Sequence, residues 1–126
     1  MVEVILVFLG AGVGAVLRFI LGSLVYTHTG RSFPYGTLVI NLTGSFAMGI
    51  LYVLVSQKLE DFTPQLTALL LVGVLGGYTT FSSFSIETLQ LFEDGKLFYA
   101  FLNIFCSTTF GILLAWLGVV LGKKIL

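Results

Sequence analysis

Apolar residues run along the chain in four long stretches, and polar residues gather in the short segments between them. The stretches cover roughly residues 4–26, 35–56, 65–92 and 97–121. Each reaches or exceeds the ~20 residues that a helix needs to cross the ~30 Å hydrocarbon core of a bilayer. Backbone groups inside lipid must be satisfied internally, and these runs are far too long to be strands of a barrel. The pattern therefore predicts four transmembrane helices.

Composition also indicates a membrane protein. Charged residues make up 10% of the 126 residues and hydrophobic residues 57%, whereas a soluble domain has roughly 25% charged residues. We expect a single all-α integral membrane domain over residues 1–126, with the lipid bilayer as a partner and no nucleic-acid partner. The single cysteine, Cys106, lies in the fourth stretch, and one His and one Cys are too few for a His/Cys metal cluster.

Positive charges are divided almost evenly between the two sides of the predicted bundle. With four spans, Lys58, Lys123 and Lys124 fall on one side and Arg31 and Lys96 on the other. The side with more Lys and Arg residues normally sets the orientation of a membrane protein. A difference of three against two is too small to set one orientation. The chain is therefore expected to insert in both directions and to pair as an antiparallel, dual-topology homodimer. A single orientation fixed by another feature is the alternative.

Two predicted helices carry a polar face. Thr37, Asn41 and Ser45 recur every four residues in the second stretch and share one side of a helix. In the fourth stretch, Asn103 and Ser107 form a similar face with Gly111, and Thr108 lies beside it. Either face, taken alone, is explained by hydrogen bonds between helices or by a water-accessible pathway through the membrane. Two such faces on different helices favour the pathway.

The third stretch contains a patch of weak helix formers. Gly76 and Gly77 are followed by Thr79 and Thr80, and glycine is about 1 kcal/mol poorer than alanine in a helix. A helix broken near the middle of the membrane frees carbonyls and amides that can line a cavity or bind ions. A packed kink is the alternative.

Phe81 and Phe84 follow this patch on one side of the resumed helix. Aromatic ring edges carry partial positive charge and can receive an anion. Glu87 lies a turn further along, where it is close enough to the end of the span to reach the interface.

The predicted lining is rich in hydrogen-bond donors, and Arg18 is its one embedded cation. A proton-coupled carrier needs a titrating group deep in the membrane, whereas an anion pore needs donors that replace hydration. The residues thus favour a small anion but do not distinguish fluoride from chloride.

Two segments carry a specific resemblance. "GTLVINLTGSF" at 36–46 and "GGYTTFSSFSIET" at 76–88 resemble the two signature stretches of the Fluc (CrcB) family of fluoride channels. Length, the four helices, Arg18 in the first span and the order of the motifs agree with that family. The resemblance implies a homodimer in the inner (plasma) membrane. Its two antiparallel pores would let fluoride leave the cytoplasm passively.

The resemblance also implies roles for individual residues. Phe81 and Phe84 match the phenylalanines that face fluoride, and Asn41 matches the pore asparagine beside them. Gly76 and Thr79 match positions whose backbone carbonyls hold a structural sodium ion at the dimer interface. The polar track is expected to include Thr37, Glu87 and Ser107, with Thr108 as the alternative to Ser107. Arg18 matches a family arginine that belongs either to the pore vestibule or to the structural framework.

Other classes of protein fit the sequence less well. A small multidrug exporter has the same size but depends on a glutamate embedded in its first span, where this chain has only Glu3 at the edge. A helper subunit without transport activity would leave the donor-rich faces unexplained. An enzyme is not expected, because no nucleophile and base are set together in a cleft.

Overall fold

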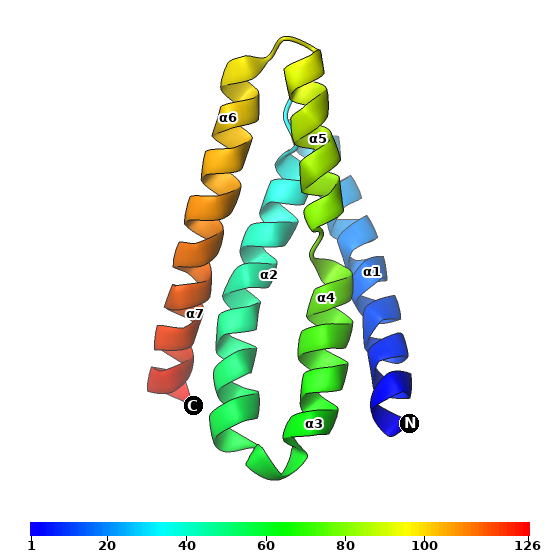
Figure 1. Ribbon diagram of the computed structural model, residues 1–126, viewed down its shortest axis with the longest axis vertical. Coiled ribbons are helices and arrows are strands. Elements are labelled where there is room, and N and C mark those ends of the chain that lie inside the picture. The colour runs from blue at the N-terminus through cyan, green and yellow to red at the C-terminus, as the bar shows by residue number, and fades with distance from the viewer.

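The computed structural model describes the backbone of residues 1–126 and the side chains of all residues except Lys58 and Glu60. Its described elements are helical, and four continuous or nearly continuous helices run along the long axis (Figure 1). The four helices that are long and apolar enough to cross a membrane are Val2–Thr29, Tyr35–Gln57, Thr63–Glu93 and Leu97–Ile125. The prediction of four such helices is confirmed.

The first two helices each begin and end at identifiable residues. Helix α1 (Val2–Thr29) ends where Gly30 adopts φ 74°, a left-handed backbone angle that glycine tolerates best. Pro34 precedes α2 (Tyr35–Val53), and a π-helical turn, η1 (Leu54–Lys58), continues α2. Helix α1 therefore extends past the predicted 4–26, since its backbone stays helical until a residue with positive φ ends it.

The third helix is assembled from several segments. A 3₁₀ turn, η2 (Glu60–Phe62), leads into α3 (Thr63–Leu66), π-helical η3 (Thr67–Leu75) and α4 (Gly76–Tyr78). Thr79 and Thr80 follow with extended backbone, and α5 (Phe81–Glu93) then resumes. We refer to Thr79 and Thr80 as the interruption.

The fourth helix follows a tight turn in which Gly95 has φ 73°. It consists of α6 (Leu97–Phe105), a π-helical turn η4 (Cys106–Phe110) and α7 (Gly111–Ile125). Helix α2 packs chiefly against α7, and α1 against η3 and α4. Both termini and the 57–62 turn lie at one end of the bundle, and the turns around 30–34 and 94–96 lie at the other (Figure 1).

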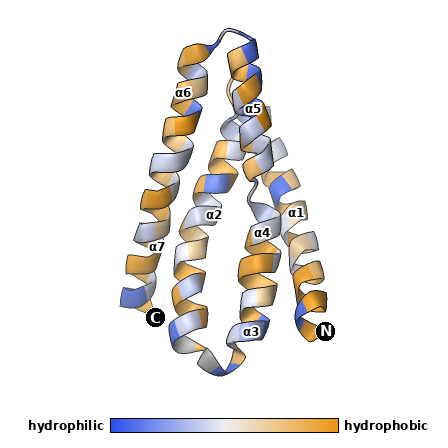
Figure 2. Ribbon diagram, in the orientation of Figure 1, coloured by the Kyte–Doolittle hydropathy of each residue, from blue (hydrophilic) through white to orange (hydrophobic). Residues whose placement is uncertain are grey.

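Glycines allow the closest helix contacts. A Cβ atom added at Gly14 of α1 would overlap the Val74 carbonyl of η3, and one at Gly49 of α2 would overlap the Ala115 carbonyl of α7. Small residues of this kind let membrane helices approach backbone to backbone. Apolar residues are spread along all four helices and many hydrophilic residues lie near the turns, but single hydrophilic bands also lie partway along α1 and α2 (Figure 2).

Candidate ion pathway

The third helix is interrupted at Thr79 and Thr80, and not at the glycines that precede them. Gly76 and Gly77 are helical, whereas Thr79 has φ −82° and ψ 160° and Thr80 has φ −152° and ψ 115°. A Cβ at Gly77 would overlap the Ala11 carbonyl of α1. Gly77 thus serves close packing on α1 within a helical segment, whereas a Cβ at Gly76 would meet no atom of α1. The two threonines supply the extended backbone.

Asn41 of α2 is hydrogen-bonded to the interruption through both ends of its side-chain amide. Its Oδ1 accepts from the Thr80 N–H at 2.8 Å, and its Nδ2 donates to the Thr80 carbonyl at 2.9 Å. The Thr80 hydroxyl accepts from the Ser83 N–H at 3.1 Å and caps α5. Both backbone polar groups of Thr80 are therefore satisfied by one side chain of α2, and the Thr80 side chain caps α5.

These side-chain bonds release two backbone carbonyls. In a continuous α-helix the N–H of Thr80 would bond the carbonyl of Gly76, and the N–H of Ser83 would bond the carbonyl of Thr79. Both N–H groups instead go to side chains. The carbonyl of Thr79 accepts from Arg18 Nη1 at 3.3 Å, so the embedded arginine of α1 lies directly at the interruption.

A hollow of about 340 Å³, here called the interruption hollow, lies between α2, the interruption and the fourth helix. Phe81 and Phe84 line it with ring centroids 5.6 Å apart, and the Phe81 side chain is 79% exposed. Ser107 and Thr108 both line it, so the two hydroxyls of η4 share one surface. The other lining residues are Asn41, Gly44, Ser45, Met48, Thr79, Thr80 and Ala115.

A chain of hydrogen bonds leads from this hollow along the contact of α5 and α6. The Ser107 hydroxyl donates to Asn103 Oδ1 at 3.4 Å, and Asn103 Nδ2 donates to Thr88 Oγ1 at 2.9 Å. Asn103 is almost completely buried. The sequence placed Asn103 on the polar face of the fourth helix, and the structure adds its partner, Thr88.

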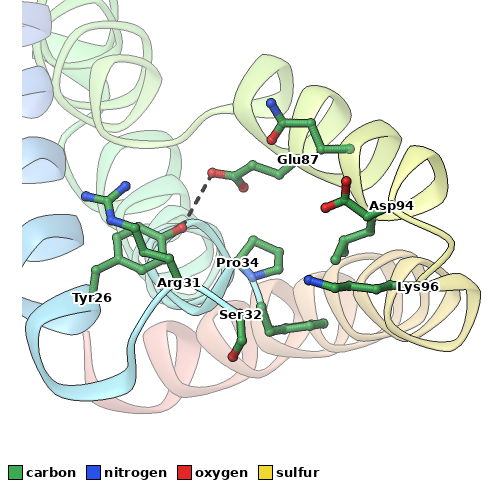
Figure 3. A pocket seen from close by; sticks show the side chains of 10 residues that line it. Tyr26, Arg31, Ser32, Pro34, Glu87, Asp94 and Lys96 are labelled. Carbon is green, nitrogen blue, oxygen red and sulfur yellow. Dashed lines mark hydrogen bonds between the residues drawn. The ribbon is translucent and has the colours of Figure 1, made fainter.

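Glu87 is hydrogen-bonded to residues of α1 and α2, and it also lines a hollow near the turns at one end of the bundle. Its Oε1 accepts from the Thr37 hydroxyl at 2.8 Å. It also accepts from the Tyr26 hydroxyl at 3.4 Å, the bond that Figure 3 shows as a dashed line. Its Oε2 is buried without a hydrogen-bond partner among the described residues. Tyr26 was not a candidate from the sequence, because an aromatic residue at the end of a span is typical of interfacial anchoring.

Two further hollows flank this carboxylate. The turn hollow, about 230 Å³, lies beside the turns at one end of the bundle (Figure 3) and is lined by Tyr26, Arg31, Ser32, Phe33, Pro34, Glu87, Gln90, Leu91, Asp94 and Lys96. The α1 hollow, about 360 Å³, is lined partly by Arg18, Thr37 and Thr80. Thr80 thus lines both the interruption hollow and the α1 hollow.

Comparison with known proteins identifies the family. Residues 5–119 match the family described as CrcB-like protein, Camphor Resistance (CrcB). The chain belongs to the CrcB family. A Coxiella burnetii relative of this CrcB chain is 48% identical over 123 residues, which cover 98% of the chain and 99% of the relative. Relatives from Magnetococcus marinus, 48% identical over 94% of this chain and 96% of their own, and Shewanella frigidimarina, 44% identical over 94% of each, share its printed name, "Fluoride-specific ion channel FluC".

The CrcB match covers every residue to which the resemblance assigned a role. It confirms the predicted family, and it gives no support to the multidrug-exporter alternative. Within this CrcB chain the structure gathers most of the predicted residues into two groups, and Gly76 belongs to neither. Asn41, Thr79, Phe81, Phe84 and Ser107 line the interruption hollow, and Thr37 and Glu87 form the second group with Tyr26. Arg18 stands between the groups through its bond to the Thr79 carbonyl.

Proposed function

We propose that this CrcB family member is a passive, fluoride-selective channel that lets fluoride leave the cytoplasm across the inner membrane. The observation that carries the proposal is the lining of the interruption hollow. Among the described residues, that lining offers aromatic rings, an amide and several hydroxyls but no carboxylate. The names of the relatives, which describe fluoride-specific ion channels, support fluoride as the ion.

The lining suits a small anion for electrostatic reasons. The lining hydroxyls donate within the chain in this structure, as Ser45 does to the Asn41 carbonyl and Thr79 to the Leu75 carbonyl. Rotated toward an ion, they would donate hydrogen bonds that replace the hydration shell, and the edges of the Phe81 and Phe84 rings add partial positive charge. Neutral donors hold an anion less tightly than a fixed cation would, so the ion can also leave. No step here requires a proton to be taken up, and transport is expected to follow the fluoride gradient.

The outer part of the pathway is proposed to follow the polar groups along α5. Ser107, Asn103 and Thr88 form one hydrogen-bonded chain, and Thr37 and Tyr26 both donate to Glu87. Glu87 would act there by fixing the orientation of the two hydroxyls. The proposed route would run from the interruption hollow toward the turn hollow, which Tyr26 and Glu87 line.

We further propose an antiparallel homodimer with two pores. In the most apolar stretch of each spanning helix, taken in chain order, only 11, 28, 17 and 6% of the residues are buried within one chain. A ring as exposed as Phe81, in a hollow that opens from the bundle, is better enclosed when a second copy covers it. In this arrangement the interruption lies near the middle of the membrane.

The released carbonyls of Gly76 and Thr79 fit a structural sodium ion at the dimer interface. Each subunit would contribute two neutral oxygens, and oxygen ligands suit hard cations. The Thr79 carbonyl has two lone pairs, so Arg18 and the cation can share it. The ion would hold the two interrupted helices together. In a high-resolution structure of the dimer, cation density should lie between these four carbonyls, and its absence would count against the ion.

The proposed activity is tested with liposomes that contain only this purified protein. Fluoride-loaded liposomes should release their fluoride without any proton gradient, and chloride-loaded liposomes should retain their chloride. Equal release of chloride, or strict dependence on a proton gradient, would refute the proposal. Protein-free liposomes with the same loading give the background leak.

A further inference from the structure

Asn41 does more in this structure than line a hollow. Its side-chain amide pairs with both polar backbone groups of Thr80, at 2.8 and 2.9 Å. An extended residue normally receives such a pair of bonds from a neighbouring strand. We propose that Asn41 is a positioning residue, which holds the interruption extended and thereby directs the Gly76 and Thr79 carbonyls. This inference rests on the cation site proposed above and assigns the residue that builds it.

The release of both carbonyls can be traced to this pairing. The Gly76 carbonyl loses its helical donor because Asn41 Oδ1 takes the Thr80 N–H. The Thr79 carbonyl loses its donor because the Thr80 hydroxyl takes the Ser83 N–H. Thr80 can cap α5 in this way only while its own backbone is non-helical, and Asn41 keeps it so. Both oxygens therefore depend on one side chain of α2.

The neighbouring residues of α2 are shaped to receive the interruption. Thr43 Oγ1 shares a hydrogen bond of 2.8 Å with the Tyr78 hydroxyl. A Cβ at Gly44 would overlap the methyl group of Thr79 and crowd the Tyr78 ring. Contacts to residues 78, 79 and 80 thus come from one short segment of α2, which is evidence that this segment seats the interruption as a unit.

The pairing also limits what Asn41 can offer an anion. Its Oδ1 is occupied by the Thr80 N–H, and one of its two amide hydrogens is directed to the Thr80 carbonyl. One hydrogen is left for an ion in the interruption hollow, which Asn41 also lines. Loss of Asn41 should therefore disturb the backbone and the cation site, and not only remove one donor.

Two measurements on the purified protein in lipid nanodiscs test this role. The first is hydrogen–deuterium exchange of peptides that cover residues 79–84. The second is the increase in thermal unfolding midpoint when sodium replaces N-methylglucamine. The variants are Asn41→Leu and Asn41→Ala, and the matched control is Asn103→Leu. Asn103 is also a hydrogen-bonded amide on a neighbouring helix, but it is buried and its Nδ2 donates to the Thr88 side chain.

We expect both Asn41 variants to exchange residues 79–84 about tenfold faster than wild type, as the loss of buried hydrogen bonds implies, and to lose the stabilisation by sodium. Asn103→Leu should keep both wild-type behaviours at this segment. Wild-type exchange in the Asn41 variants, or equal acceleration in Asn103→Leu, overturns the proposal. Faster exchange in a variant that sodium still stabilises also overturns the proposal, since the carbonyls would then be directed without Asn41.

Further outcomes separate this inference from the proposed function. If wild type shows no stabilisation by sodium, the cation site fails, and exchange alone decides whether Asn41 holds the interruption. If wild type conducts no fluoride, the channel proposal fails. Hydrogen exchange and stabilisation by sodium then still test the role of Asn41. Should neither Asn41 variant assemble, Asn41→Asp keeps the acceptor for the Thr80 N–H but, when ionised, replaces the donor by a carboxylate oxygen that repels the Thr80 carbonyl. Measured at a pH where this carboxyl is ionised, it should exchange residues 79–84 faster than wild type, and a wild-type rate there overturns the proposal.

Discussion

At the scale of single residues, the positions of Phe81 and Phe84 indicate that these side chains contribute little to the fold. Their rings contact each other at 5.6 Å and face the interruption hollow. Phe81 is 79% exposed within the chain, so it contributes little to packing in one subunit. A ring that its own chain leaves this exposed, beside hydroxyl and amide groups of the same hollow, is better explained by its ring edge than by its volume.

Replacing Phe81 or Phe84 by Ile should lower fluoride flux sharply while leaving the fold intact. Isoleucine keeps apolar bulk but has no aromatic quadrupole, and a volume-conserving swap costs less than about 1.5 kcal/mol of stability. Flux from liposomes and thermal unfolding are measured on the same preparations. Phe98→Ile is the control, because Phe98 is also highly exposed, at 74%, and lies outside the hollow. Folded Phe81→Ile or Phe84→Ile protein with wild-type flux would show that the rings only fill space.

Residue-scale contacts were only partly predictable from the sequence. The four-residue spacing of Thr37, Asn41 and Ser45 places them on one face of a helix, but it does not say which neighbour each one meets. The bond from Thr37 to Glu87 spans 50 positions and that from Asn41 to Thr80 spans 39. Such pairs are set by how the helices pack against each other. Tyr26 escaped notice for the same reason, since only tertiary structure brings it to Glu87.

At the scale of elements, the limits of the helices were predictable to within a few residues. Hydropathy located the four helices, because the bilayer thickness fixes their length. The patch of weak helix formers at 76–80 pointed to the right region of the third helix. It could not show that Gly77 stays helical against α1, because that depends on the close approach of Ala11.

Close packing of α1 on the third helix gives an element-scale prediction. A Cβ at Gly14 would overlap the backbone of Val74 and approach that of Tyr78, whereas a Cβ at Gly12 meets no atom within 4 Å. Gly14→Ala should therefore destabilise the protein by about 1–3 kcal/mol through overpacking. Gly12→Ala, the matched control on the same helix, should be neutral or stabilise it by up to about 1 kcal/mol.

Thermal unfolding of the two variants beside wild type checks this prediction. A lower midpoint for Gly14→Ala alone is expected. Because the third helix leads directly into the interruption, Gly14→Ala should also reduce fluoride flux, and Gly12→Ala should not. Equal midpoints for the two variants would mean that α1 and η3 are further apart than the structure places them.

At the scale of the whole molecule, the two ends of the bundle differ little in charge. The end with both termini and the 57–62 turn has three Lys or Arg residues, Lys58, Lys123 and Lys124, and the opposite end has two, Arg31 and Lys96. Insertion follows the side with more Lys and Arg, so a difference of one leaves the orientation weakly determined. An antiparallel pair requires this near balance, because both orientations must be made from one sequence.

Shifting that balance should force every copy into one orientation. Adding two or three lysines to the turns at 30–34 and 94–96 is expected to place that end in the cytoplasm, and adding them to the 57–62 turn and the carboxyl terminus should place the other end there. Accessibility of single cysteines introduced in the turns, on a Cys106→Ser background, reports the orientation.

Each locked variant alone should then conduct little or no fluoride, and co-expression of the two opposite variants should restore flux. The physical reason is that an antiparallel interface needs the interruption of one copy to face that of an inverted copy, so that their released carbonyls meet at a shared cation. A same-orientation pair has its two-fold axis along the membrane normal, so it cannot form the interface proposed for the antiparallel pair. The control adds glutamines at the same positions, which lengthens the turns without altering their charge. If each locked variant conducts as well alone as in the mixture, the antiparallel homodimer is wrong and the pore must be complete within one orientation.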